Sequence, residues 1–354
     1  MKWWDNLWLN EGREFAFAFP ERTLFPDWKV YLSFYTAHTE SALSLDARLS
    51  SHAVQVEVPN ADDIGQIFDS LSYSKAASVL RMLSVYTGEE KFLRGVSIYL
   101  KNHLYGNTVV EDLWAGIQQA TGLNIPTLMA NWVSQIGYPV LTVKEIDGSI
   151  HIHQDRFLIT SKANEKDNQT IWHIPLRIQT INSKGEVTVE EQALLTTRET
   201  TYKLDVNSLY KLNTGGTGFY WVFYPSEHFA KLGLEAARVE STLSTEDHLS
   251  LLNDAMTLAT AGYSDTSGVL TFIDGLKEVE TEYLVWKCIK DQVELVIQSR
   301  SDKADEEGLW DFLRTIVAPL SRKLGYVYLP GEHTDILQLR TILVGMAAAY
   351  GLTE

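Results

Sequence analysis

The spacing of apolar residues changes twice along this chain of 354 residues, and the two changes limit the folds open to it. Over residues 1–137 the apolar positions mostly recur every three or four residues, which predicts helices. Residues 138–224 alternate instead, as short strands do, and residues 225–354 return to the helical period. We therefore expect a multidomain α+β protein in which a helical part, a small antiparallel β-sandwich and an α-helical solenoid-like domain follow one another in these ranges.

Local signals mark several of the expected elements. Thr108 and Glu111 form a capping-box pair ahead of one apolar helix face, and Ser244 and Asp247 form a second such pair. The stretch "FAFAFPE" at 15–21 alternates like a strand. Strands are expected in the segments "PVLTV", "HIHQDRFLIT", "WHIPLRIQT", "EVTVEEQALL" and "GFYWVFYP".

Charge and cysteine content narrow the class of protein. The 46 acidic residues exceed the 30 basic ones, giving a net charge of −16. Nucleic acids and anionic membranes select for basic patches, so neither is an expected partner. Cys288, the single cysteine, lies in an apolar segment and is expected to be buried rather than nucleophilic. No 18-residue apolar run and no signal-peptide start occur, so we expect no membrane span and a cytoplasmic location.

Several weaker candidate sites favour a structural interpretation. His151 and His153 lie two residues apart on one face of an expected strand, but no third metal ligand is evident nearby, which favours a surface strand pair. "NTGGTG" at 213–218 runs into a strand rather than a helix, so it is interpreted as a turn and not as an anion-binding loop.

Two further segments are less easily explained by packing. The chain opens with "MKWWDNLWLNEG", in which Glu11 follows three tryptophans, whereas most chain ends are polar and frayed. The second segment is "FDSLSYSKAASVLRML" at 68–83, with Tyr73 at the start of an apolar helix. On spacing alone, a tyrosine at such a position is usually half-buried packing.

Together the two segments resemble the gluzincin aminopeptidases of the alanyl and puromycin-sensitive type. That family has a Glu within W-L-N-E-G, eighteen residues after an H-E-x-x-H helix. The resemblance extends over essentially the whole chain through supporting segments, and the family's domain order is that of the three zones: the helical remainder of a thermolysin-like catalytic domain, a sandwich and a solenoid. These supporting segments are "ALSLDARLSSHAVQVEV", "NWVSQIGYPVLTV", "TGFYWVFYP" and "LSLLNDAMTLATAG".

The resemblance implies roles for single residues. Glu11 corresponds to the third zinc ligand, beside two histidines that leave a coordination position for water. Tyr73 corresponds to the tyrosine that donates a hydrogen bond to the oxyanion of the tetrahedral intermediate. The nearby Trp3, Trp4, Asp5 and Trp8 are expected to pack behind the site. The implied substrates are peptides with a free N-terminus.

The chain also departs from the family pattern. It contains no H-E-x-x-H, and since only ten residues precede Glu11, that helix is expected to fall before Met1. The family's G-x-M-E-N segment is absent, Ala76 replaces a common glycine, and the solenoid stops short of its usual extent. We therefore expect this chain alone to retain no stoichiometric zinc and to be inactive. If other residues supply the missing ligands, His38 and His52 are the first to test.

Two other interpretations stay open. The sandwich and solenoid could form a non-catalytic module that binds peptides or a partner protein. Alternatively the chain could be a truncated product without a function of its own. The specificity for the N-terminal residue and the oligomeric state are not determined by the sequence.

Overall fold

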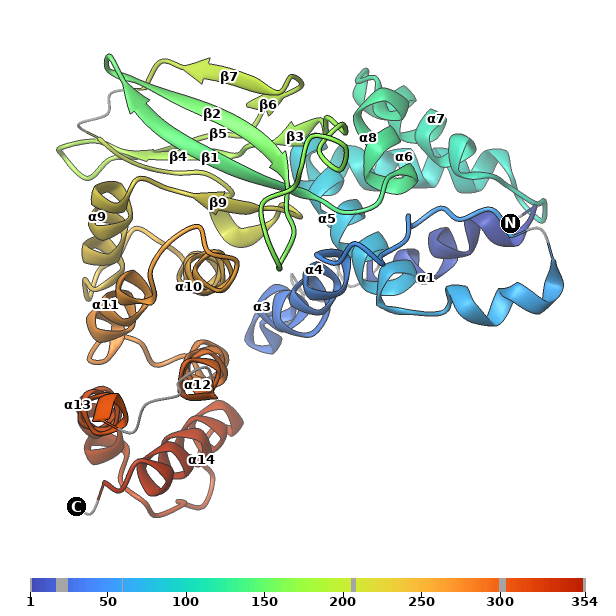
Figure 1. Ribbon diagram of the computed structural model, residues 1–354. Coiled ribbons are helices and arrows are strands. Elements are labelled where there is room, and N and C mark those ends of the chain that lie inside the picture. The colour runs from blue at the N-terminus through green and yellow to red at the C-terminus, as the bar shows by residue number, and fades with distance from the viewer. Residues whose placement is uncertain (1, 17–24, 59, 205–207, 299–303, 353–354) are drawn as a thin grey trace. The chain divides into compact units, whose positions relative to one another are not determined.

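The computed structural model describes residues 2–16, 25–58, 60–204, 208–298 and 304–352 (Figure 1). It consists of helices and small sheets, which confirms a mixed α+β protein. The chain divides into two compact units, Met1–Tyr224 and Pro225–Glu354. Within the described residues, no helix is both long enough and apolar enough to cross a membrane.

The first unit begins with helices that surround α5 (Ala76–Thr87). This helix is buried at every position except Val85, so it forms the centre of the helical part. Against it pack α1 and α6, each of which has one apolar face. The other elements of this part are η1 (Trp4–Asn6), α1 (Leu7–Ala16), η2 (Pro26–Trp28), α3 (Val30–Phe34), η3 (Tyr35–Thr39), α4 (Glu40–Asp46), η4 (Ala61–Ile67), η5 (Leu71–Lys75), α6 (Glu89–Asn102), α7 (Val110–Thr121) and α8 (Ile125–Ser134).

Two local predictions in this part were wrong. Helix α7 begins after Val109, whose backbone N–H donates to the Asp112 carboxylate at 3.0 Å, so Thr108 and Glu111 are not its capping pair. The Thr108 hydroxyl is buried and bonds instead to the Tyr99 hydroxyl at 2.7 Å. The start of "FAFAFPE" is helical, because α1 continues through Ala16; residues 17–24 lie outside the described part of the chain.

Three small sheets follow the helices. The first has the strand order β7-β2-β1-β9, the second β3-β6 and the third β5-β4-β8. Among the described strands, all pairs are antiparallel except β1 with β9. In the part of the chain that the structure describes, every paired strand lies within 139–223. The strands are β1 (Pro139–Ile146), β2 (Ser149–Arg156), β3 (Ile174–Pro175), β4 (Ile178–Ile181), β5 (Val187–Glu190), β6 (Leu194–Leu195), β7 (Glu199–Tyr202), β8 (Leu209–Lys211) and β9 (Trp221–Phe223).

Gly137 joins the helices to the first sheet. Its φ of +84° is strained for any other residue, and a Cβ there would lie 2.6 Å from Arg156 Nε. Its backbone N–H donates to Asp46 at 3.0 Å and its carbonyl accepts from Lys75 Nζ at 3.1 Å. The fully buried Asp46 and Lys75 form an ion pair at 2.6 Å. The same pair therefore fixes α4, η5 and the start of β1.

The second unit consists of helices that pack on near neighbours in sequence: α9 on α11, α10 on α11 and α12, and α14 on α12 and α13. Helix α10 has the predicted capping box, in which Ser244 and Asp247 exchange hydrogen bonds. Cys288 of α12 is buried, as predicted. The helices are α9 (Ser226–Ala236), α10 (Thr245–Thr260), α11 (Thr266–Leu276), α12 (Tyr283–Gln298), α13 (Ala304–Leu324) and α14 (Thr334–Ala349).

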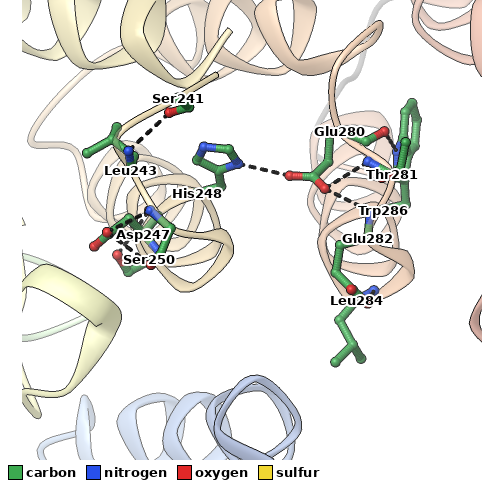
Figure 2. A network of polar contacts seen from close by, with 11 residues as sticks. Ser241, Leu243, Asp247, His248, Ser250, Glu280, Thr281, Glu282, Leu284 and Trp286 are labelled. Atoms are coloured by element: carbon green, nitrogen blue, oxygen red, sulfur yellow. Dashed lines mark hydrogen bonds and ion pairs between the residues drawn. The ribbon is translucent and has the colours of Figure 1, made fainter. Parts of the chain in front are cut away.

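A buried polar network connects α10 to the start of α12 (Figure 2). His248 Nδ1 lies 2.9 Å from Glu280 Oε2, and both side chains are almost fully buried. The other carboxylate oxygen of Glu280 accepts from the backbone N–H groups of Thr281 and Glu282, at 2.9 and 2.7 Å. Trp286 Nε1 donates to the Glu280 carbonyl at 3.0 Å. One glutamate thus fixes the two residues just before α12 and links them to α10.

Candidate active site

Glu11 lies in the middle of α1 and is half-buried. The next residue, Gly12, sits directly on the start of α5: a Cβ added to it would lie 2.9 Å from Ala76 Cβ and 3.2 Å from the Ala77 nitrogen. Helix α1 also contacts η5, the turn that precedes α5. The backbone segments that carry Glu11 and Tyr73 are therefore neighbours in the fold.

The tryptophans beside Glu11 differ in their surroundings. Trp8 is buried against Trp114 of α7, with ring centroids 6.1 Å apart. Trp3 is 51% exposed and its indole N–H donates to the Val58 carbonyl at 2.9 Å, so it packs less than expected. Trp4 makes an edge contact with Phe68.

Tyr73 lies half-buried in η5, a single π-helical turn. Asp69 caps the start of this turn: its Oδ1 accepts from the backbone N–H groups of Leu71 at 2.8 Å and Ser72 at 3.2 Å. The Tyr73 N–H donates to the Asp69 carbonyl at 3.2 Å. At the other end of the turn stands Lys75, which belongs to the buried pair with Asp46. Isolated π-helical turns are frequent at functional sites.

The second π-helical turn, η3, packs against η5. His38 Nδ1 lies 3.2 Å from the Ser74 hydroxyl, and the hydroxyls of Thr39 and Ser78 are 3.1 Å apart. Burial lowers the pKa of His38 from 6.5, so the ring is neutral at neutral pH. The first of the two alternative histidines named from sequence thus lies beside the residue that follows Tyr73.

His52, the second alternative, also reaches the Tyr73 turn. Its Nε2 lies 2.7 Å from Asp69 Oδ2, and its Nδ1 lies 2.7 Å from the Ala53 carbonyl. Sequence inspection missed Asp69, although an aspartate just before the first helical residue is an N-cap signal that could have identified it.

The described residues do not form a zinc site. Nowhere in the described ranges do three or more His, Cys, Asp or Glu side chains come together in a way that could hold a metal ion. A catalytic zinc takes three protein ligands and water, and Glu11 supplies one carboxylate. The fit of the described residues to zinc is therefore partial.

A separate hollow of about 610 Å³ lies over the exposed side of β1, β2 and β7. Its lining includes His151 and His153, the pair considered from sequence. His153 Nε2 lies 3.2 Å from Asp155 and His151 Nδ1 lies 3.2 Å from the Thr201 hydroxyl. Both histidines are thus surface strand residues with polar neighbours.

Two families match the chain. Residues 1–132, which contain Glu11 and Tyr73, match the family described as "Peptidase family M1 domain". Residues 209–354 match the family described as "ERAP1-like C-terminal domain".

Curated relatives match it over most of its length. Aminopeptidase 2 of Candida albicans is 36% identical over 353 residues, or 98% of this chain and 37% of the relative. Alanine/arginine aminopeptidase of Saccharomyces cerevisiae is 37% identical over 290 residues, which are 82% of this chain and 33% of the relative. Puromycin-sensitive aminopeptidase of Caenorhabditis elegans is 30% identical over 365 residues, which cover 99% of this chain and 37% of the relative. The chain thus spans about a third of the length of these relatives.

Proposed function

Because this chain belongs to peptidase family M1, we propose that it forms part of a zinc-dependent aminopeptidase that removes N-terminal residues from peptides. In this proposal, residues 1–137 are the C-terminal helical part of a thermolysin-like catalytic domain. Residues 138–224 form a β-sandwich domain and residues 225–354 part of a solenoid-like domain.

One structural observation carries the proposal for the site. The W-L-N-E-G helix packs through Gly12 directly on Ala76, at the start of the helix that follows Tyr73. Zinc ligand and oxyanion donor must be held by one rigid framework, since catalysis depends on the geometry between them. Direct backbone contact between α1 and α5 provides such a framework.

The two residues have different tasks. Glu11 would be one carboxylate ligand of the family's zinc, and the metal would supply an activated water for peptide hydrolysis. Tyr73 donates its phenolic hydrogen to the carbonyl oxygen as negative charge develops there. Removing one donor of this kind typically lowers kcat by about 10²- to 10³-fold.

As an isolated polypeptide, the 354-residue chain is expected to be inactive. Its sequence has no H-E-x-x-H, so it offers neither the two histidine ligands nor the general-base glutamate of that motif. Elemental analysis of the purified chain should find no stoichiometric zinc, and added zinc should not produce hydrolysis of aminoacyl anilides. One tightly bound zinc per chain that is lost on Glu11→Ala, or turnover abolished by Tyr73→Phe, would contradict this expectation.

A further inference from the structure

We infer that His52 and Asp69 form a positioning pair for Tyr73: protonated His52 holds the Asp69 carboxylate on the first N–H groups of the Tyr73 turn, and loss of that proton loosens the turn. The inference rests on the proposed role of Tyr73 in the reaction. It makes His52 a proton-dependent support that touches neither substrate nor metal.

The geometry at His52 requires a charged ring. Nδ1 faces the Ala53 carbonyl and Nε2 faces the Asp69 carboxylate, each at 2.7 Å, and both partners can only accept. A neutral imidazole has one N–H and could satisfy one of the two contacts, whereas the imidazolium donates to both. The Asp69 carboxylate needs both its oxygens in this arrangement, one for His52 and one for the helix start.

Asp69 transmits the state of His52 to the turn. Its Oδ1 accepts from Leu71 and Ser72, while its carbonyl accepts from Tyr73. A neutral His52 would leave either Asp69 Oδ2 or the Ala53 carbonyl without its donor, and in both tautomers it would lose the positive charge that attracts the Asp69 carboxylate, so the carboxylate would be held less firmly at the helix start. The first N–H groups of η5 would then lose an acceptor that a helix end needs.

The far end of the turn does not share this sensitivity. Lys75 is fully buried and bonds to the equally buried Asp46 and to the Gly137 carbonyl. Asp46 also accepts from the Ser51 hydroxyl at 2.5 Å, next to His52 in sequence. The turn is thus fixed at Lys75 and adjustable at Asp69, with Tyr73 between the two.

The charges around the pair favour the protonated ring. The hydrogen bond to Asp69 raises the pKa of His52 from 6.5 against an opposing effect of burial, and the Ala53 carbonyl and the charges of Asp69 and Asp46 add to the rise. Burial alone would raise the pKa of Asp69, but the hydrogen bonds from His52, Ser72 and Leu71 outweigh it and lower that pKa. Asp69 and Asp46 are the charged groups that act on His52, and Asp46 is itself paired with Lys75.

NMR titration of the 354-residue chain tests the inference without zinc or substrate. The ¹³Cε1 signal of His52 should titrate with a midpoint above 6.5. The amide signals of Leu71 and Ser72, and the ring signals of Tyr73, should shift with the same midpoint. In His52→Gln these shifts should vanish, and in Asp69→Asn the His52 midpoint should fall toward 6.5.

His103 provides a matched control. It lies 3.8 Å from Asp112, which also caps a helix, and the two side chains are exposed to a similar degree as His52 and Asp69. His103→Gln should leave the Tyr73 signals unchanged. A His52 midpoint at or below 6.5 would overturn the inference. The inference would also be overturned if the chemical shifts of Leu71, Ser72 and Tyr73 stayed constant while His52 titrates. Both outcomes can be measured in the wild-type chain, so the test does not depend on whether a variant folds.

The two proposals can fail separately. If Tyr73 takes no part in catalysis, Tyr73→Phe will leave the turnover of a completed enzyme unchanged while the NMR titration still links His52 to the turn. If the titration fails, the effect of Tyr73→Phe on turnover is untouched.

Discussion

At the scale of single residues, the glycine of W-L-N-E-G, Gly12, is required by helix packing rather than by reaction chemistry. Its neighbour across the helix interface is Ala76, a position where the family commonly has glycine. The α5 side of this contact therefore carries the Ala76 methyl group, and there is no room for a second methyl group on the α1 side. Glycine at position 12 is what allows α1 to approach α5.

Gly12→Ala should destabilise the first unit by about 1–3 kcal/mol, because the new methyl group would force α1 away from α5. Chemical denaturation followed by tryptophan fluorescence measures the change. Gly65→Ala is the control in the same unit, since no atom lies within 4 Å of the added Cβ. Equal stabilities of the two variants would show that α1 does not need this close contact.

The His52–Asp69 pair should also make stability depend on pH. Because the His52 pKa is raised in the folded state, its contribution to stability is complete below pH 6.5 and is lost as the pH rises through the folded-state pKa. Because the Asp69 pKa is lowered, its contribution is complete above pH 3.8 and is lost as the pH falls through the folded-state pKa. His52→Gln should therefore cost about 0.5–1 kcal/mol at pH 5.5, given the partial exposure, and nearly nothing at pH 9. A pH-independent difference in unfolding free energy would refute this.

The sequence pointed to Glu11 and Tyr73 as candidate site residues only because each lies in a recognisable motif. It did not identify Asp69 as the residue that holds the Tyr73 turn, nor His52 as the partner of Asp69. The two lie 17 residues apart and meet through a loop, so no period along the chain connects them. The same holds for Asp46 and Lys75, whose pairing depends on how α4 packs.

At the scale of elements, the hydrophobic period predicted the long helices and the long strands. It missed β7, which is polar and partly exposed, and β8, which has only three residues, and it could not predict the π-helical turns η3 and η5. A π-helical turn adds one residue to a helical turn but leaves no signal in the types of residue present, so it is seen only in the folded structure. The start of α7 was predicted one residue too early because Thr108 is a typical N-cap residue, whereas Val109, which occupies the N-cap position, is not.

Glu280 fixes the segment that leads into α12 and connects it to His248 of α10. Glu280→Ala should destabilise the second unit by about 2 kcal/mol, since it removes acceptors from two backbone N–H groups and leaves buried His248 without its partner (Figure 2). Glu278→Ala, an exposed position two residues earlier, should change stability by less than about 0.5 kcal/mol. Thermal unfolding of both variants provides the comparison, and equal melting temperatures would contradict it.

At the scale of the whole molecule, the order of helices, strands and helices followed from the two changes of period. The assignment of that order to an aminopeptidase did not: it came from the two short motifs and then from relatives that match 82–99% of this chain. Physical pattern alone distinguishes fold class, whereas the reaction depends on a few side chains whose partners can lie anywhere in the sequence.

The most direct measurement of the central claim is zinc content and anilide turnover in a completed site. The part of the Candida albicans aminopeptidase 2 that precedes its match to this chain would be joined to residue 1. The fusion should bind about one zinc and turn over. Glu11→Gln should lose the zinc, and Tyr73→Phe should keep it while kcat falls about 10²- to 10³-fold. The surface changes Glu111→Gln and Tyr105→Phe should alter neither. Full zinc content and turnover in Glu11→Gln, or an unchanged kcat in Tyr73→Phe, would contradict the account.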